Sequence, residues 1–209
     1  MRKPQIAIFS PFAIICIGFI VAYALYPLMS EWVFVPLALI YWAVTFAVSY
    51  RTLGKEEFVK LFGKPAGKPL WPVLCFVVGL IPLSILLMNL DLLRLSVTTV
   101  LWVAFAIINP FCEEIFWRGF LLTHLPFPKK ISVVYSTALF VASHPFMWGV
   151  FSIANRSWMT WVSLSIMGIV WSITYLKTES LRWCIISHFM VDIFNLSVFV
   201  FLNLYIPPV

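Results

Sequence analysis

Two adjacent carboxylates and a guanidinium lie inside an apolar stretch of the chain. Glu113, Glu114 and Arg118 fall within residues 109–120, whose flanks have the composition of a membrane span. Each such group costs roughly 2.5 to 3.5 kcal/mol at the centre of a span, so partners must offset that cost. On a helix Glu114 and Arg118 share a face and can form a charge-assisted pair. Glu113 points about 100° away from Glu114 on a helix, so we expect a second polar group from elsewhere to contact it.

Three further ionisable side chains occupy apolar stretches nearer the C-terminus: His144, His188 and Asp192. At about 1.5 Å of rise per residue, these groups and Glu113 all lie on the order of 10–20 Å from the basic ends of their spans. They can therefore meet at one level of a helical bundle. Ionisable residues gathered inside a membrane protein are a functional hypothesis by default.

These residue types permit a specific chemistry. A carboxylate that binds water, here Glu113, acts as a general base when an imidazole such as His144 shares the water's protons. A second imidazole with a side-chain donor one helical turn away can stabilise an oxyanion, and His188 and Asp192 have that four-residue spacing. Together the groups predict hydrolysis of a carbonyl compound, above all a peptide, without a covalent intermediate.

Other interpretations of the same residues stay open. Two histidines and two carboxylates could hold Zn²⁺, but the HExxH and HxxEH motifs are both absent, and we expect no metal and no cofactor. Cys112 with His144 could form a cysteine nucleophile, whereas Ser143 lacks a GxSxG context and is expected to pack. Glu114 with Arg118 could serve only to fix helix packing.

The composition places the chain in a bilayer. With 63% hydrophobic and 11% charged residues among 209, it is too apolar for a soluble domain, and its apolar runs are long enough to span a membrane. We predict an all-α fold, a polytopic transmembrane bundle of about seven to eight helices. Residues 1–209 are expected to form one domain. The expected spans are about 6–29, 32–50, 71–90, 95–122, 131–150, 159–176 and 182–204.

The basic residues are distributed unevenly over the two sides of this layout. The net charge is +6, yet no basic and aromatic module lies outside the spans, so nucleic acid is not an expected partner. Residues 51–70 suit either a short helix on an anionic membrane surface or a solvated basic loop. The positive-inside rule predicts a cytoplasmic N-terminus and a C-terminus on the far side. The small size and the lack of a visible organelle address favour a bacterial inner membrane, with the endoplasmic reticulum as the alternative. The basic residues on the predicted cytoplasmic side are Arg2, Lys3, Arg51, Lys55, Lys60, Lys64, Lys68, Lys129, Lys130, Lys177 and Arg182.

Three motifs in the second half of the chain resemble the signature of a known family. They are Glu113-Glu114-x-x-x-Arg118, Phe140-x-x-x-His144 and His188-x-x-x-Asp192. In this order they resemble the CAAX protease and bacteriocin-processing family of glutamic-type intramembrane proteases, over a catalytic core of about 109–195. The resemblance implies an eight-helix-like bundle, a glutamate-activated water without obligatory metal, and a site that opens toward the cytoplasm and the lipid.

The resemblance also implies roles for individual residues. Glu113 would activate the water with help from His144, and His188 with Asp192 would lie on the oxyanion side. Glu114 and Arg118 would form the structural pair.

Position 192 departs from the pattern of the prenyl-processing members, which have Asn there. An ionised Asp192 cannot donate a hydrogen bond to an oxyanion. It is therefore protonated, or it orients His188, or Asn195 contributes the donor instead. Of these alternatives we favour the orientation of His188.

The expected function is that of an intramembrane endopeptidase. Its partners would be the lipid bilayer and a membrane-anchored protein or peptide substrate, cleaved for maturation, sorting or self-immunity. A transporter or proton-relay protein is one alternative, because buried Glu, His and Asp also line ion paths. That alternative predicts inverted repeats and paired discontinuous spans, which the sequence does not show. A non-catalytic membrane chaperone or immunity partner of the same fold is the other.

Overall fold

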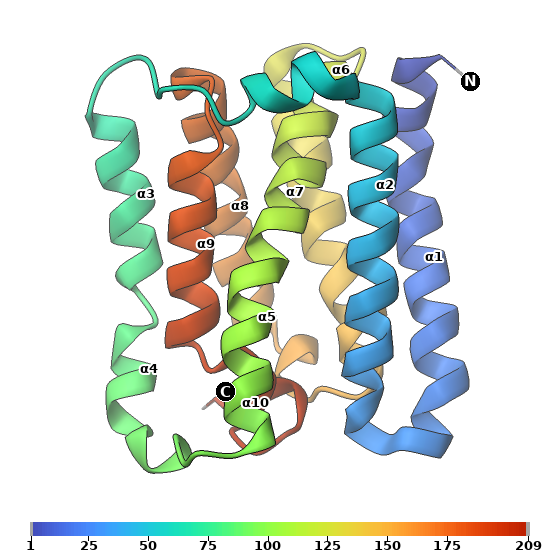
Figure 1. Ribbon diagram of the computed structural model, residues 1–209, viewed down its shortest axis with the longest axis vertical. Coiled ribbons are helices and arrows are strands. Elements are labelled where there is room, and N and C mark those ends of the chain that lie inside the picture. The colour runs from blue at the N-terminus through green and yellow to red at the C-terminus, as the bar shows by residue number, and fades with distance from the viewer. Residues whose placement is uncertain (1, 208–209) are drawn as a thin grey trace.

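The computed structural model describes residues 2–207, and these residues form a bundle of upright helices (Figure 1). The chain is 82% helical, and the described part contains no strand. The all-α fold class and the approximate helix number predicted from the sequence are thereby confirmed. In chain order the α-helices are α1 (Lys3–Met29), α2 (Phe34–Lys60), α3 (Leu70–Leu80), α4 (Leu83–Met88), α5 (Val97–Glu114), α6 (Leu121–His124), α7 (Lys129–Phe146), α8 (Trp158–Thr178), α9 (Arg182–Phe194) and α10 (Ser197–Phe201).

Five helical segments of residues 2–207 are long and apolar enough to cross a membrane, by length and composition. The first of them comprises both α1 and α2, which are joined by the short 3-10 helix η1 (Ser30–Val33). Large apolar side chains on the outside of these helices are exposed, as a bilayer requires. The segments are Lys3–Lys60, Leu70–Met88, Val97–His124, Lys129–Val150 and Trp158–Thr178.

Two predicted spans are interrupted, although the third span still corresponds to the apolar segment Leu70–Met88. The third span divides into α3 and α4 at Ile81 and Pro82, where proline supplies no backbone N–H to continue the helix. The seventh span divides after α9, because Leu196 takes a left-handed conformation with φ of 58°. Ser197 then donates its hydroxyl to the carbonyl of Asp192 and starts α10.

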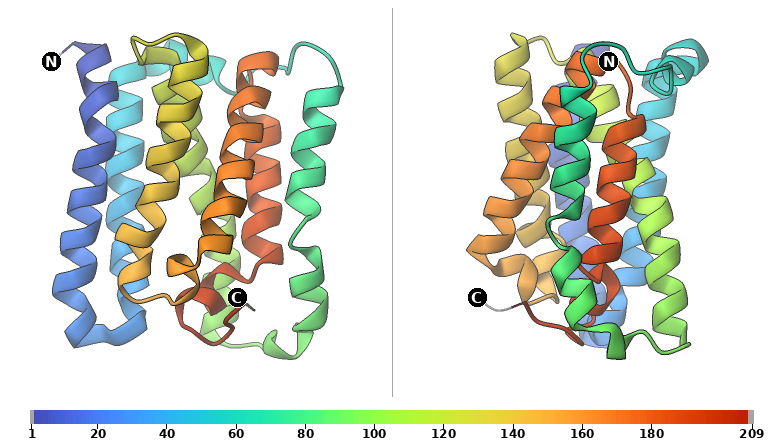
Figure 2. Two further views of the ribbon diagram at one scale, coloured as in Figure 1. Left: turned by 180° about the vertical axis from the view of Figure 1, so that it is seen from behind. Right: turned by 90° about the vertical axis from the view of Figure 1, so that its left-hand side faces the viewer.

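The basic segment after the second span is helical at its start. Helix α2 continues to Lys60 but bends at Gly54, whose φ of 73° favours glycine. Beyond the bend the chain lies across the end of the bundle that carries the N-terminus (Figures 1 and 2). Leu61 is buried there, and its carbonyl accepts a hydrogen bond from the backbone N–H of Leu181 at 2.8 Å. A solvated loop over the whole of residues 51–70 is therefore excluded.

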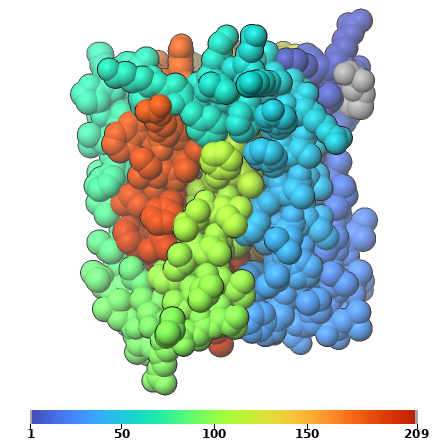
Figure 3. Space-filling model, viewed as in Figure 1, coloured from blue at the N-terminus to red at the C-terminus, as the bar shows by residue number. Residues whose placement is uncertain are grey.

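One face of the bundle brings together three helices that are distant in sequence. The space-filling view shows α9, α5 and α2 side by side, with the segment after Gly54 above them (Figure 3). Helix α5 packs against both α2 and α9. It continues through η3 (Ile115–Phe120), a π-helix whose six residues are all buried. Such π-helical turns inside α-helices occur frequently at functional sites.

Candidate active site

The bundle gathers the predicted polar side chains around the upper part of α5. Glu113 and Glu114 end α5, His144 lies near the end of α7, and His188 and Asp192 lie one turn apart on α9. Glu113 is only 2% exposed, His188 4% and Asp192 6%. Ionisable groups this deeply buried need partners, so their contacts define the chemistry of the site.

Glu113 is held by polar groups from two other helices. The hydroxyl of Tyr41 on α2 donates to Glu113 Oε1 at 2.6 Å, and Trp117 Nε1 donates to the same hydroxyl at 2.9 Å. His188 Nε2 lies 3.5 Å from Glu113 Oε2. The partner that the sequence required for Glu113 is therefore Tyr41, together with His188 and the amide of Asn109, whose Nδ2 lies 3.4 Å from Oε2.

Glu114 contacts both an arginine and a histidine through one carboxylate oxygen. Its Oε1 accepts from Arg118 Nη1 at 2.9 Å, so the pair expected from the four-residue spacing is present. The same oxygen lies 2.9 Å from His188 Nδ1. A carboxylate oxygen only accepts, so His188 carries its proton on Nδ1 and turns Nε2 toward Glu113. The guanidinium of Arg118 lies over the Phe140 ring, 4.3 Å from its centroid, which adds a cation–π contact.

Contacts with neighbouring side chains fix the orientation of the His188 ring plane as well as its tautomer. Trp171 stacks on it with ring centroids 4.5 Å apart. Asp192 Oδ2 lies 3.8 Å from Nε2, farther than Glu114 lies from Nδ1. The group that orients His188 most closely is therefore Glu114, whereas the sequence argument favoured Asp192 for this role.

His144 faces the same space from the other side. Its Nδ1 lies 2.9 Å from the carbonyl of Phe140, and a carbonyl only accepts, so the proton resides on Nδ1. In the neutral ring Nε2 is then free to accept a proton. Ser143, its neighbour, donates to the same carbonyl at 2.7 Å and packs inside the bundle, as expected.

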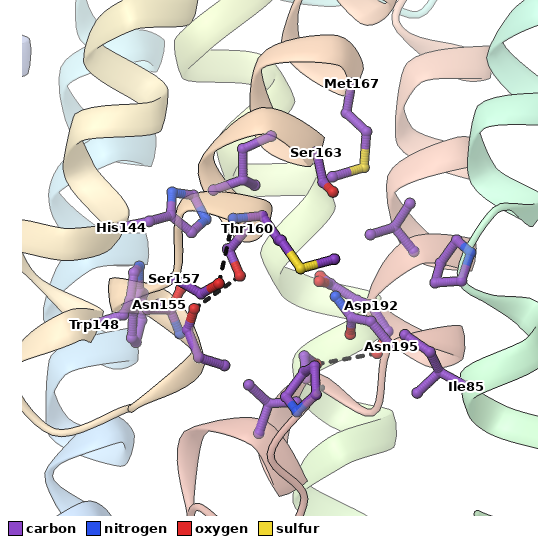
Figure 4. A pocket seen from close by; sticks show the side chains of 18 of the residues that line it. Ile85, His144, Trp148, Asn155, Ser157, Thr160, Ser163, Met167, Asp192 and Asn195 are labelled. Carbon is purple, nitrogen blue, oxygen red and sulfur yellow. Dashed lines mark hydrogen bonds between the residues drawn. The ribbon is translucent and has the colours of Figure 1, made fainter. Parts of the chain in front are cut away.

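These groups line one cavity of about 680 Å³. Figure 4 shows His144 and Asp192 on opposite sides of it, with Asn195 below Asp192. Glu113 and His188 line it too, whereas Glu114 and Arg118 stand behind them. The polar side chains thus face one another across a space large enough for a peptide segment (Figure 4).

The cavity extends toward the end of the bundle opposite the N-terminus. Its lining continues to Asn155 and Arg156 in the loop between α7 and α8, and to Tyr205 near the C-terminus. That loop and the C-terminus lie at the far end in both views (Figure 2). The resemblance implied an opening toward the cytoplasm and the lipid, and which end of the bundle faces the cytoplasm stays a prediction.

The lower part of the cavity is bordered by α4 and α8. Helix α3 packs against both α8 and α9, whereas α4 packs against α9 and not closely against α8. Ile85 on α4 and Met167 on α8 line the space between them (Figure 4). The close packing of this span against α8 therefore ends at the break between α3 and α4.

Residues of the site that the sequence argument missed come mainly from α2. Tyr41 and Trp42 lie in an apolar span without a motif, so nothing local marked them. Asn109 precedes Glu113 by one helical turn, and that four-residue spacing could have identified it. Within residues 2–207 no group of three or more His, Cys, Asp or Glu side chains has an arrangement that could hold a metal ion.

Comparison with known families agrees with this geometry. Residues 95–194, which contain all three motifs, match the family model described as type II CAAX prenyl endopeptidase Rce1-like. They have the fold of a CAAX-type intramembrane protease, and the family is one of hydrolases. The domain over these residues is one of the CAAX protease and bacteriocin-processing family, as the motif resemblance predicted. No curated protein and no solved structure shows significant similarity to the chain.

Proposed function

We propose that the protein is a glutamic-type intramembrane endopeptidase that hydrolyses a peptide bond of a membrane-associated protein or peptide. The observation that carries the proposal is the position of Glu113. Its carboxylate is buried, is held at Oε1 by Tyr41, and lines a cavity together with His144 and His188. A carboxylate so placed can take a proton from a water that attacks a carbonyl carbon.

The proposed reaction needs only groups of this chain. Glu113 removes a proton from the water, and the oxygen attacks the scissile carbonyl to give a tetrahedral oxyanion. His188 donates to the oxyanion through Nε2 when its ring carries both protons. Collapse breaks the C–N bond, and the proton taken up by Glu113 passes to the leaving amine, with His144 Nε2 as the assisting group.

The proposed orientation follows from charge. The predicted cytoplasmic Lys and Arg residues lie at the bundle end that carries the N-terminus (Figure 1), so the positive-inside rule places this end in the cytoplasm. The connection before α5, which contains Arg94, and the loop between α7 and α8, which contains Arg156, lie at the other end (Figure 2). We place the protein in a bacterial inner membrane, so that the cavity extends toward the non-cytoplasmic leaflet.

The experiment that tests the activity compares cells producing wild type or Glu113→Gln at equal membrane abundance. The readout is intact-mass profiling of small membrane and secreted proteins. The matched control is Glu57→Gln, which makes the same exchange in the exposed ion pair of Glu57 with Lys3. The proposal expects a cleaved species that disappears only in Glu113→Gln. An unchanged profile would oppose it and favour a structural or ion-conducting role, which Glu113-dependent ion flux in proteoliposomes would then establish.

A further inference from the structure

We propose that Asn109 supplies a side-chain amide that donates to the substrate oxyanion. The inference rests on the proposed peptidase function and adds a residue to its site. Glu113 and Asp192 line the cavity near this amide, and a carboxylate in its ionised form only accepts hydrogen bonds. Oxyanion stabilisation requires donors aimed at the developing charge.

The amide of Asn109 has a defined orientation. Trp42 Nε1, which only donates, lies 2.9 Å from Asn109 Oδ1. The other end of the amide, Nδ2, is therefore turned toward the two carboxylates. Trp42 itself packs against Phe105 with ring centroids 5.4 Å apart, which restricts the indole that holds the amide. The orientation thus follows from donor chemistry and packing together.

The two hydrogen bonds that Nδ2 makes are long. It lies 3.4 Å from Glu113 Oε2 and 3.2 Å from Asp192 Oδ2, whereas ordinary N–H to O bonds cluster near about 2.9–3.0 Å. A short charge-assisted bond to an oxyanion would be stronger than either. The amide can therefore exchange one of these contacts for the substrate when the cavity is occupied.

Asn109 also lies where such a donor is needed. It precedes Glu113 by four residues on α5, so both side chains face the same cavity. A water bound at Glu113 Oε2 and a carbonyl oxygen bound at Asn109 Nδ2 would place the carbonyl carbon between them. Asn109 is only 4% exposed, so the surrounding protein limits the access of water to the amide.

Asn89, an amide that does not line the cavity, provides the matched control. It follows α4, and its Nδ2 donates to the carbonyl of Ile85 at 2.8 Å. Replacing Asn89 by alanine should leave the turnover number within about threefold of wild type.

The test uses the protein of residues 1–209 in proteoliposomes. Its substrate is a fluorogenic peptide that contains the cleavage site identified by the comparison of wild type with Glu113→Gln in cells. Asn109→Ala and the isosteric Asn109→Asp should each lower kcat by about 100-fold, the usual cost of one oxyanion donor, with KM within about twofold. The double variant Asn109→Ala/Asp192→Asn places an amide next to the vacated position. It should regain at least about tenfold over Asn109→Ala, which a misfolded protein would not do.

Three results would overturn the inference. The first is an Asn109→Ala variant that keeps kcat within about threefold. The second is a rise in KM with unchanged kcat, which would show substrate binding alone. The third is a double variant as slow as Asn109→Ala, which would show that Asn109 only separates the carboxylates of Glu113 and Asp192. Retained cleavage by Glu113→Gln would instead remove the peptidase proposal itself, so the two failures are distinguishable.

Discussion

Glu114 Oε1 lies 2.9 Å from both Arg118 Nη1 and His188 Nδ1, and so joins two motifs whose residues are 74 positions apart in the chain. The adjacent carboxylate of Glu113 faces the cavity instead. The two glutamates therefore have different surroundings: Glu114 holds His188 in place, and Glu113 lies at the cavity, where we propose that it acts on water.

The buried pair of Glu114 and Arg118 should be essential for stability. Both side chains are at most 1% exposed, so Arg118→Leu leaves a buried carboxylate without its cation, at a cost of about 3–5 kcal/mol. We expect a large fall in the thermal unfolding midpoint in detergent. Lys3→Leu, which breaks the exposed pair with Glu57, should cost under about 1 kcal/mol. Equal midpoints for the two variants would contradict this view of the pair.

The hydroxyl of Tyr41 should matter for turnover and little for folding. Tyr41→Phe keeps the ring and removes the 2.6 Å hydrogen bond to Glu113. Hydrogen bonds to charged groups contribute about 1.5–3 kcal/mol, so kcat should fall by roughly 10- to 100-fold. Steady-state kinetics on the identified peptide would measure the change, and Tyr50→Phe on the outer face of α2 is the control. A Tyr41→Phe enzyme with wild-type kcat would show that Glu113 does not depend on this contact.

The two ends of the bundle should lie on opposite sides of the membrane. We expect Arg94→Cys to react with a membrane-impermeant maleimide in intact cells, and Lys64→Cys to react only after permeabilisation. The native cysteines serve as background, since Cys75, Cys112 and Cys184 are buried and Cys16 lies in the apolar α1. The reverse labelling pattern would place the cavity on the cytoplasmic side.

Much of this fold could be predicted from local sequence. Continuous apolar runs determined α1, α2 and α8, because a helix in a bilayer satisfies its own backbone hydrogen bonds. The pairing of Glu114 with Arg118 followed from helical spacing alone. The break in the third span could have been predicted from Pro82. The break in the seventh span could not, because leucine is not a residue type that favours the left-handed conformation of Leu196.

The parts of the site that could not be predicted depend on helix rotation. Nothing in the apolar sequence of α2 shows which of its faces meets α5, so Tyr41 and Trp42 were not identified. The choice of Glu114 over Asp192 as the group that holds His188 also depends on how α9 is rotated against α5. Such rotations are determined by packing between segments far apart in the chain.

The central claim is that Glu113 activates a water for peptide hydrolysis. The most direct measurement is cleavage of the identified peptide by purified wild type and Glu113→Gln in H₂¹⁸O, followed by mass spectrometry, with and without a chelator. The account predicts that wild type incorporates one ¹⁸O into the new carboxylate whether or not chelator is present, and that Glu113→Gln gives no product. Cleavage by Glu113→Gln at the wild-type rate would contradict it.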